Sequence, residues 1–198
     1  IWQHMTIKEE LIDYANRCLA GEEISGKKHK WACIRFLQDC KKEDAKNVQA
    51  NVWPYHWDEE EASKIVDWFA MLRHSKGDLA GQPIRLTDWQ KFNLCQLYGW
   101  REDLTSYKRF KQSFIEVGRK NAKSQMEAGV ALYEISVMAT RNEENYEYYT
   151  AGTKRDQSKI ILNEAKLMLN KSPLKPLFKI TRDAVIHRKT GSFIKALS

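Results

Sequence analysis

The segment from Phe114 to Ser124, FIEVGRKNAKS, constrains the fold of this chain more than any other part of its sequence. An apolar, strand-like stretch stops at a small basic turn, and Lys123-Ser124 then opens a stretch rich in Ala and Met that is typical of a helix. Loops that bind phosphate have this order. Their backbone N–H groups and the positive end of the helix face the anion, a lysine reaches the outer phosphates, and a hydroxyl ligates Mg²⁺. The sequence therefore predicts a phosphate-binding loop between a strand and a helix.

The loop departs from the usual pattern G-x-x-x-x-G-K-[ST]. Aligned on Lys123-Ser124, Val117 takes the place of the first glycine and Ala122 that of the second. Alanine at the second position requires either a negative φ or a mildly strained backbone. A basic surface turn at the start of a helix is the structural alternative, but the flanking strand-like and helix-like stretches favour a nucleotide site.

The side chains of the loop suit a triphosphate. Lys123 is the best candidate for the phosphate lysine because Ser124, the candidate Mg²⁺ ligand, follows it. Arg119 and Lys120 add positive charge inside the loop. A guanidinium at that place bridges two phosphate oxygens in a fork that lysine cannot form.

A second motif lies about thirty residues upstream, in the stretch PIRLTDWQ that ends at Gln90. A glutamine amide can pair with N6 and N7 of adenine, as it does when proteins recognise adenine in DNA. A neighbouring aromatic residue such as Trp89, or Pro83, can cover the base. Without the downstream loop Gln90 would be an ordinary exposed helix residue; together with the loop it predicts adenine recognition.

The composition sets limits on the class of protein. The 198 residues suffice for one good core, with a small accessory region at the N-terminus. A net charge of +7 is compatible with a nucleic-acid partner and equally with a solvated surface. No apolar run approaches the roughly 18 to 20 residues of a membrane span. The four cysteines form no C-x-x-C pair and His29, Cys33 and Cys40 fit no common zinc spacing, so reduced thiols in helix cores are expected.

The hydrophobic periodicity changes character near Tyr107, which predicts a helical region over 1–105 and a second region over 106–198. The first region reads as all helix, with its aromatic residues at core positions rather than on a platform for bases. In the second, strands and helices alternate, which predicts an α/β fold with a parallel sheet and helical crossovers. The helices are expected over 6–20, 28–40, 58–74, 87–99, 123–139 and 156–169, and the strands over 110–117, 147–151, 178–181, 184–187 and 192–197, with a hairpin among the last three.

These motifs, taken in order, resemble the large terminase subunit of tailed bacteriophages, the motor that packages DNA into procapsids. Four landmarks carry the resemblance: the helical lead-in from Tyr14 to Asp39, the stretch from Ala80 to Phe92, the loop from Val117 to Ser124, and YTAGTKRDQ from Tyr149 to Gln157. In that family an arginine inside the loop is common.

The resemblance implies a P-loop ATPase core of the additional-strand type, with ATP and Mg²⁺ as ligands. Gln90 would recognise adenine, Arg119 and Lys123 would contact the triphosphate, and Ser124 would ligate Mg²⁺. The backbone of Gly118, Arg119, Lys120, Asn121, Ala122, Lys123 and Ser124 would surround the phosphates. Thr153 and Gln157 would couple the nucleotide state to DNA.

The resemblance also implies partners and a location. The parent protein would act on double-stranded DNA with a small terminase subunit and the portal of the procapsid. It would form an oligomeric ring in the cytoplasm of the infected bacterial host, without a membrane.

One expected element of the family is missing from the sequence. No apolar run ending in Asp-Glu follows Ser124, and neither Glu143-Glu144 nor Asp183 has that context. The chain is therefore expected to be an N-terminal fragment that lacks the catalytic acids of the Walker B strand and the nuclease domain. Such a fragment would bind ATP and hydrolyse it slowly or not at all. Another P-loop helicase or translocase, and a non-catalytic DNA-binding or adaptor module, remain the alternatives.

Overall fold

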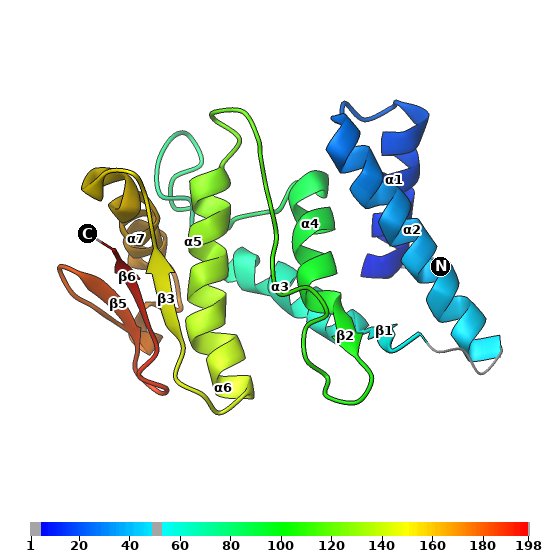
Figure 1. Cartoon of the computed structure of the whole chain (residues 1–198). Helices are drawn as coiled ribbons and strands as arrows, with labels where there is room; N and C mark the ends of the chain where they lie inside the picture. Colours follow the sequence, from blue (N-terminus) through cyan, green and yellow to red (C-terminus); the bar gives the residue numbers. More distant parts are fainter. Residues whose placement is uncertain (1–4, 49–52, 198) are drawn as a thin grey trace. The chain divides into compact units, whose positions relative to one another are not determined.

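The computed structural model describes residues 5–48 and 53–197, which divide into two compact units (Figure 1). The first unit comprises Ile1–Val66 with Leu86–Phe114, and the second comprises Asp67–Arg85 with Ile115–Ser198. Helix α3 contributes to both. Each unit is described by itself, and the domain boundary that the sequence places between residues 105 and 106 remains a prediction.

The first unit is mainly helical, as predicted. Its helices are α1 (Ile7–Ala20), α2 (Lys27–Val48), the first part of α3 (Glu59–Met71) and α4 (Asp88–Gly99). Helix α1 begins at a capping box in which Thr6 and Glu9 exchange hydrogen bonds, and it ends at Gly21, whose φ of 87° is left-handed. The core is built largely from fully buried rings and aliphatic side chains of these helices: Leu11, Phe36, Ile65, Phe92 and Tyr98.

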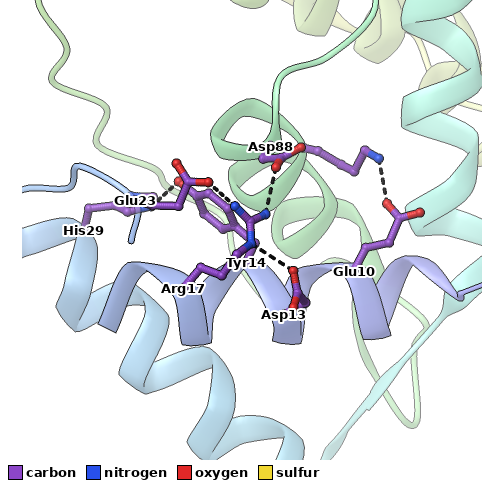
Figure 2. Close-up of polar contacts among 8 residues, drawn as sticks. Glu10, Asp13, Tyr14, Arg17, Glu23, His29 and Asp88 are labelled. Carbon is purple, nitrogen blue, oxygen red and sulfur yellow. Dashed lines mark hydrogen bonds and ion pairs between the residues drawn. The ribbon is translucent and has the colours of Figure 1, made fainter. Parts of the chain in front are cut away.

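Charged side chains connect α1 to α4 at the surface of this unit (Figure 2). Arg17 binds Asp13 and Glu23 and also reaches Asp88 at the start of α4, where Nη2 lies 2.8 Å from the carboxylate. Lys91 Nζ lies 2.6 Å from Glu10 Oε2. Partly exposed pairs of this kind contribute roughly 0–1 kcal/mol each, so they orient the two helices more than they stabilise them.

The prediction that the first region is all helix is wrong in one respect. Strands β1 (Tyr55–Trp57) and β2 (Trp100–Glu102) form a short antiparallel ladder in which Trp57 pairs with Trp100. Aromatic residues favour strands when a partner is within reach. Here the partner follows Gly99, where a Cβ would lie only 2.8 Å from the Trp57 ring, so glycine permits the close approach.

The second unit contains one long helix, a shorter one and a four-stranded sheet. The long helix comprises α5 (Lys123–Tyr133), a π-helical segment η1 (Glu134–Met138) and α6 (Ala139–Arg141). The other elements are α7 (Arg155–Asn170), the 3-10 turn η2 (Lys175–Leu177) and the strands β3 (Glu147–Thr150), β4 (Phe178–Ile180), β5 (Ala184–His187) and β6 (Phe193–Ala196). All six of these predicted elements are confirmed with small shifts at their ends.

The sheet has the order β3-β6-β5-β4 and is mixed. Strands β3 and β6 are parallel, whereas β5 runs antiparallel to both β6 and β4. The predicted parallel sheet is therefore correct only for the pair that α7 separates along the chain. The connections between β4 and β5 and between β5 and β6 are too short for a crossover, so these strands form hairpins.

Helix packing in the second unit depends on a glycine. Trp68, in the last part of α3, donates from Nε1 to the Gly129 carbonyl of α5 at 3.0 Å. A Cβ at Gly129 would lie 2.3 Å from Cε1 of Phe69, so the two helices approach as closely as a missing side chain allows. Helix α7 packs against α5 and against β3, β5 and β6. The helix that follows the predicted loop is thus fixed between α3 and α7.

The predicted strand over 110–117 is wrong: these residues form no strand. A strand exists only where a neighbour completes its ladder, and within residues 5–48 and 53–197 no such ladder pairs with this segment. Phe114 is 80% exposed, whereas Ile115 and Val117 are partly covered. None of the helices in the described ranges has both the length and the apolar character that a membrane span requires.

Candidate nucleotide-binding site

The backbone of the loop from Gly118 to Ser124 has alternating handedness. Lys120 has a φ of 70° and Ala122 a φ of 53°, while Asn121 between them is not left-handed. Such alternation turns successive N–H groups toward one side and forms a concave surface that suits an anion. For Ala122 the strained alternative is the one observed, at a cost of about 1–2 kcal/mol. Strain of this size in an exposed loop is typical of functional sites.

Asn121 holds the loop in this conformation. Its side-chain Nδ2 donates to the carbonyl oxygens of Gly118 at 3.1 Å and Arg119 at 3.4 Å. Both bonds lie within the turn, so they close the loop on itself and leave its outer surface open. From the sequence, Asn121 was expected to contribute only its backbone to the loop. The tendency of asparagine to bond to the nearby backbone in turns was the signal for this role.

The loop opens directly into the positive end of α5. Residue Ala122, at the N-cap, has no side chain that could accept from the first turn, and that turn contains no acidic residue. The first backbone hydrogen bond of the helix is from Met126 N–H to the Ala122 carbonyl, at 2.9 Å. Helix N–H groups before this point require an acceptor from outside the helix. Together with the helix dipole they favour an anion.

The side chains around this helix end are the right types for a phosphate ligand. Arg119, Lys120 and Lys123 are all exposed and positively charged, and the Ser124 hydroxyl lies in the first turn of α5, half-buried. Two or three cations beside a row of N–H groups match the charge of a di- or triphosphate. The serine hydroxyl is the kind of hard oxygen ligand that Mg²⁺ takes together with phosphate oxygens. The donor set of this chain therefore fits ATP with Mg²⁺.

Thr153 and Gln157 are brought together where β3 leads into α7. Thr153 Oγ1 lies 2.7 Å from Gln157 Oε1, and both side chains are exposed. The turn is tight, because a Cβ at Gly152 would lie 2.9 Å from both Gln157 Cβ and Ser158 N. Thr150 Oγ1 donates to the Ser158 carbonyl at 2.5 Å and fixes the strand to the helix. Within the second unit, the C-terminal end of β3 and the N-terminal end of α5 lie on the same side (Figure 1).

Trp89 and Gln90 belong to the first unit and the loop to the second. Gln90 is buried, at 7% exposure. Its Oε1 accepts from the Thr87 backbone N–H at 3.0 Å, as the third residue of a capping box does. The structure thus shows a helix-capping role for Gln90, and adenine recognition by Trp89 and Gln90 remains a prediction.

These features define the class of the protein: an α/β protein in which a strained basic loop opens a helix packed beside a mixed sheet. The family model described as "Terminase large subunit, ATPase domain" matches residues 88–198. Because that match covers more than half of the chain, the chain belongs to the terminase large subunit family, within its ATPase domain.

A solved structure has a similar fold. The structure titled "Crystal structure of the HK97 bacteriophage large terminase" is similar with a TM-score of 0.55 and 23% sequence identity. The similarity covers 69% of this chain and 27% of that one, so the present chain spans about a quarter of the length of the HK97 protein. At this identity the likeness supports the fold alone. No curated protein matches this chain significantly in sequence.

Proposed function

We propose that the loop from Gly118 to Ser124 binds ATP with Mg²⁺, as part of a motor that packages double-stranded DNA. The observation that carries the proposal is the strained loop itself, in which Lys120 and Ala122 are left-handed and α5 begins without a side-chain cap. Membership in the terminase ATPase family supports the choice of ATP among possible anions. When bound, ATP supplies the phosphoanhydride bond whose hydrolysis releases free energy.

The residues of the loop have separate tasks in this proposal. Lys123 neutralises the outer phosphates, and the planar guanidinium of Arg119 bridges two of their oxygens. The backbone N–H groups from Gly118 through Lys120, Asn121 and Ala122 to Ser124 surround the phosphates, and the hydroxyl of Ser124 ligates Mg²⁺. The side chain of Asn121 contacts the loop backbone instead, which makes it a positioning residue.

Two further pairs have proposed roles outside the loop. Thr153 and Gln157 respond to the phosphate state at the end of β3 and pass the change to α7, which begins in the same turn. Gln90 recognises adenine with its amide, beside the ring of Trp89. The Gln90 oxygen retains a second lone pair after accepting from Thr87, so the capping bond and an adenine contact are compatible.

The partners follow from the family. Double-stranded DNA would be contacted through its phosphates, independently of sequence and with strong dependence on salt. The small terminase subunit, the portal of the procapsid and other copies of the chain in a ring complete the motor, in the cytoplasm of the infected bacterium.

We further propose that the 198-residue chain turns ATP over more slowly than ~1 s⁻¹, the low end of ordinary enzyme rates. The sequence after Ser124 contains no apolar run ending in Asp-Glu to orient the attacking water. A steady-state turnover above that rate would refute this point.

The test of the proposal is a calorimetric titration of the chain with ATP, with and without Mg²⁺. Lys123→Ala should weaken ATP binding about 10- to 100-fold, since a hydrogen bond to a charged group contributes roughly 1.5–3 kcal/mol. Lys179→Ala, which removes an exposed lysine from β4, is the matched control and should leave the affinity unchanged. Equal affinities for the wild type and Lys123→Ala would show that the loop is not the phosphate site.

A further inference from the structure

Three side chains of types that ligate metals meet in the first unit, where α1 ends and α2 begins. Cys18 comes from α1, and His29 and Cys33 come from α2 at a spacing of four residues, which places both on one helix face. One ligand atom from each side chain lies within 4.8 Å of the other two. The sequence suggested a different set, His29, Cys33 and Cys40, whose spacing fits no common zinc site. Cys18 joins His29 and Cys33 only in the folded helical hairpin.

The spacing of the three atoms is close to that of a bound ion. At the observed upper limit of 4.8 Å, the centre of an equilateral triangle lies about 2.8 Å from each corner. Zinc bonds are about 2.3 Å to sulfur and 2.0–2.1 Å to nitrogen. At that limit, a contraction of about 0.5 Å for each sulfur and about 0.7–0.8 Å for the nitrogen would complete these bonds.

The surroundings of the cluster hold its members in place. Cys18 and Cys33 are fully buried. The Tyr14 hydroxyl lies 3.1 Å from Nε2 of His29, as Figure 2 shows, and the Phe92 ring packs edge-on against the imidazole at 5.4 Å. Imidazole ligates metals in its neutral form, through one of its two ring nitrogens. Little ordering remains to be lost when an ion binds.

We propose that Cys18, His29 and Cys33 bind one Zn²⁺ ion and thereby cross-link α1 to α2. Two sulfur ligands and an imidazole select a borderline-soft ion over Mg²⁺ and Ca²⁺, which prefer oxygen. The Tyr14 hydroxyl also interacts with Cys18. The site is structural, and it is separate in chemistry from the Mg²⁺ expected at Ser124.

The binding reaction has a defined proton balance. Cysteine thiols are mostly protonated at neutral pH and ligate metals as thiolates. Each Zn–S bond forms as a thiol loses its proton to solvent, so one ion releases two protons. The affinity therefore rises with pH, and the bound ion stabilises the folded chain by mass action.

The experiment uses the full chain, kept reduced and stripped of metal with a chelator. Co²⁺ replaces Zn²⁺ as the probe because its visible spectrum reports tetrahedral geometry and its near-ultraviolet bands report bound thiolates. We expect one equivalent of Co²⁺ to bind with a tetrahedral spectrum, two protons to be released, and one equivalent of Zn²⁺ to displace it. Cys18→Ala and Cys33→Ala should weaken Zn²⁺ binding more than about 100-fold, beyond the 10- to 100-fold typical for loss of an outer-shell partner.

The chain provides its own controls. Cys40→Ala and Cys95→Ala remove buried free thiols outside the cluster and should bind Co²⁺ as the wild type does. If Cys18→Ala fails to fold, the thiolate bands and the proton count of the wild type still decide the question. An absent tetrahedral spectrum at tenfold excess of Co²⁺ would overturn the proposal. So would equal loss of binding in Cys40→Ala, or a Cys18–Cys33 disulfide in place of a metal. Lys123→Ala should bind Co²⁺ normally, so failure at this cluster and failure at the loop are distinguishable.

Discussion

At the scale of single residues, the left-handed backbone of Lys120 and Ala122 and the hydrogen bonds of Asn121 determine the shape of the loop before α5. The sequence pattern placed the loop at the start of a helix, because Lys-Ser after a small basic turn is a local signal. It left the conformation of Ala122 open, and it did not reveal that Asn121 closes the turn. It also did not reveal that Gln90 is buried, since the depth of a helix residue depends on what packs over it. Local chemistry is encoded locally, whereas burial and strain are decided by the rest of the fold.

The strain at Ala122 can be measured by relieving it. Ala122→Gly should raise the free energy of unfolding by about 0.5–1 kcal/mol, because the left-handed conformation costs alanine about 1–2 kcal/mol and glycine returns part of this through its freer unfolded chain. Urea denaturation measures the change. Ala128→Gly, a buried position inside α5, should instead lose about 1 kcal/mol or more. If Ala122→Gly is destabilising by a similar amount, the left-handed assignment is wrong.

At the scale of elements, helices were predicted well and strands less well. The amphipathic periods of α1, α2, α3 and α7 are properties of each segment alone, so they could be recognised in the sequence. Strands β1 and β2 and the segment 110–117 depend on a partner that lies elsewhere in the chain. The apolar residues before the loop therefore predicted a strand that does not form, whereas Trp57 and Trp100 form one that was missed.

The packing of α5 against α3 gives a prediction at this scale. Gly129→Ala should destabilise the chain by roughly 1–3 kcal/mol, because its Cβ would overlap the Phe69 ring, although alanine is the better helix former by about 1 kcal/mol. Thermal unfolding followed by circular dichroism measures the effect. Gly26→Ala is the control, since a Cβ there meets nothing within 4 Å. The double variant Gly129→Ala with Phe69→Leu should recover part of the lost stability, because leucine leaves more room for the new Cβ than phenylalanine does. If the second substitution recovers none of it, the proposed overlap with Phe69 is wrong.

At the scale of the whole molecule, two motifs that the sequence suggested as one nucleotide site belong to different units: Gln90 to the first and the loop to the second. Residues 67–85 belong with the loop and the sheet, and residues 86–114 with the N-terminal helices, a division that no local signal marks. The mixed sheet has the same origin, because the parallel pairing of β3 with β6 is fixed only when α7 crosses between them.

The buried thiols should make the folded chain less stable as the pH rises above 9. Burial raises the pKa of Cys40 and of Cys95 to about 12, from an ordinary value near 9. The unfolded chain therefore loses these protons first, as the pH passes 9, while the folded chain keeps them until about pH 12. The free energy of unfolding should be flat below pH 9 with respect to these groups and fall above it by about 1.4 kcal/mol per pH unit for each thiol. Urea denaturation from pH 8 to 10.5, with reductant and chelator, measures this slope.

The variant Cys95→Ala separates the thiol effect from other groups that titrate in the same range. It should reduce the slope between pH 9 and 10.5 by the contribution of one thiol, whatever its effect at pH 8. An unchanged slope would mean that the Cys95 thiol ionises equally in the folded and unfolded chain.

The most direct test of the central claim is amide hydrogen exchange of the chain with saturating ATP and Mg²⁺, measured at single-residue resolution. If the loop binds the phosphates through its backbone, the N–H groups of residues 118–125 should exchange at least about tenfold more slowly with ATP and Mg²⁺, because each bound N–H must first be released. With adenosine, which has no phosphates, their exchange rates should not change. Protection elsewhere, with residues 118–125 exchanging at the same rate in the bound and free chain, would contradict the account.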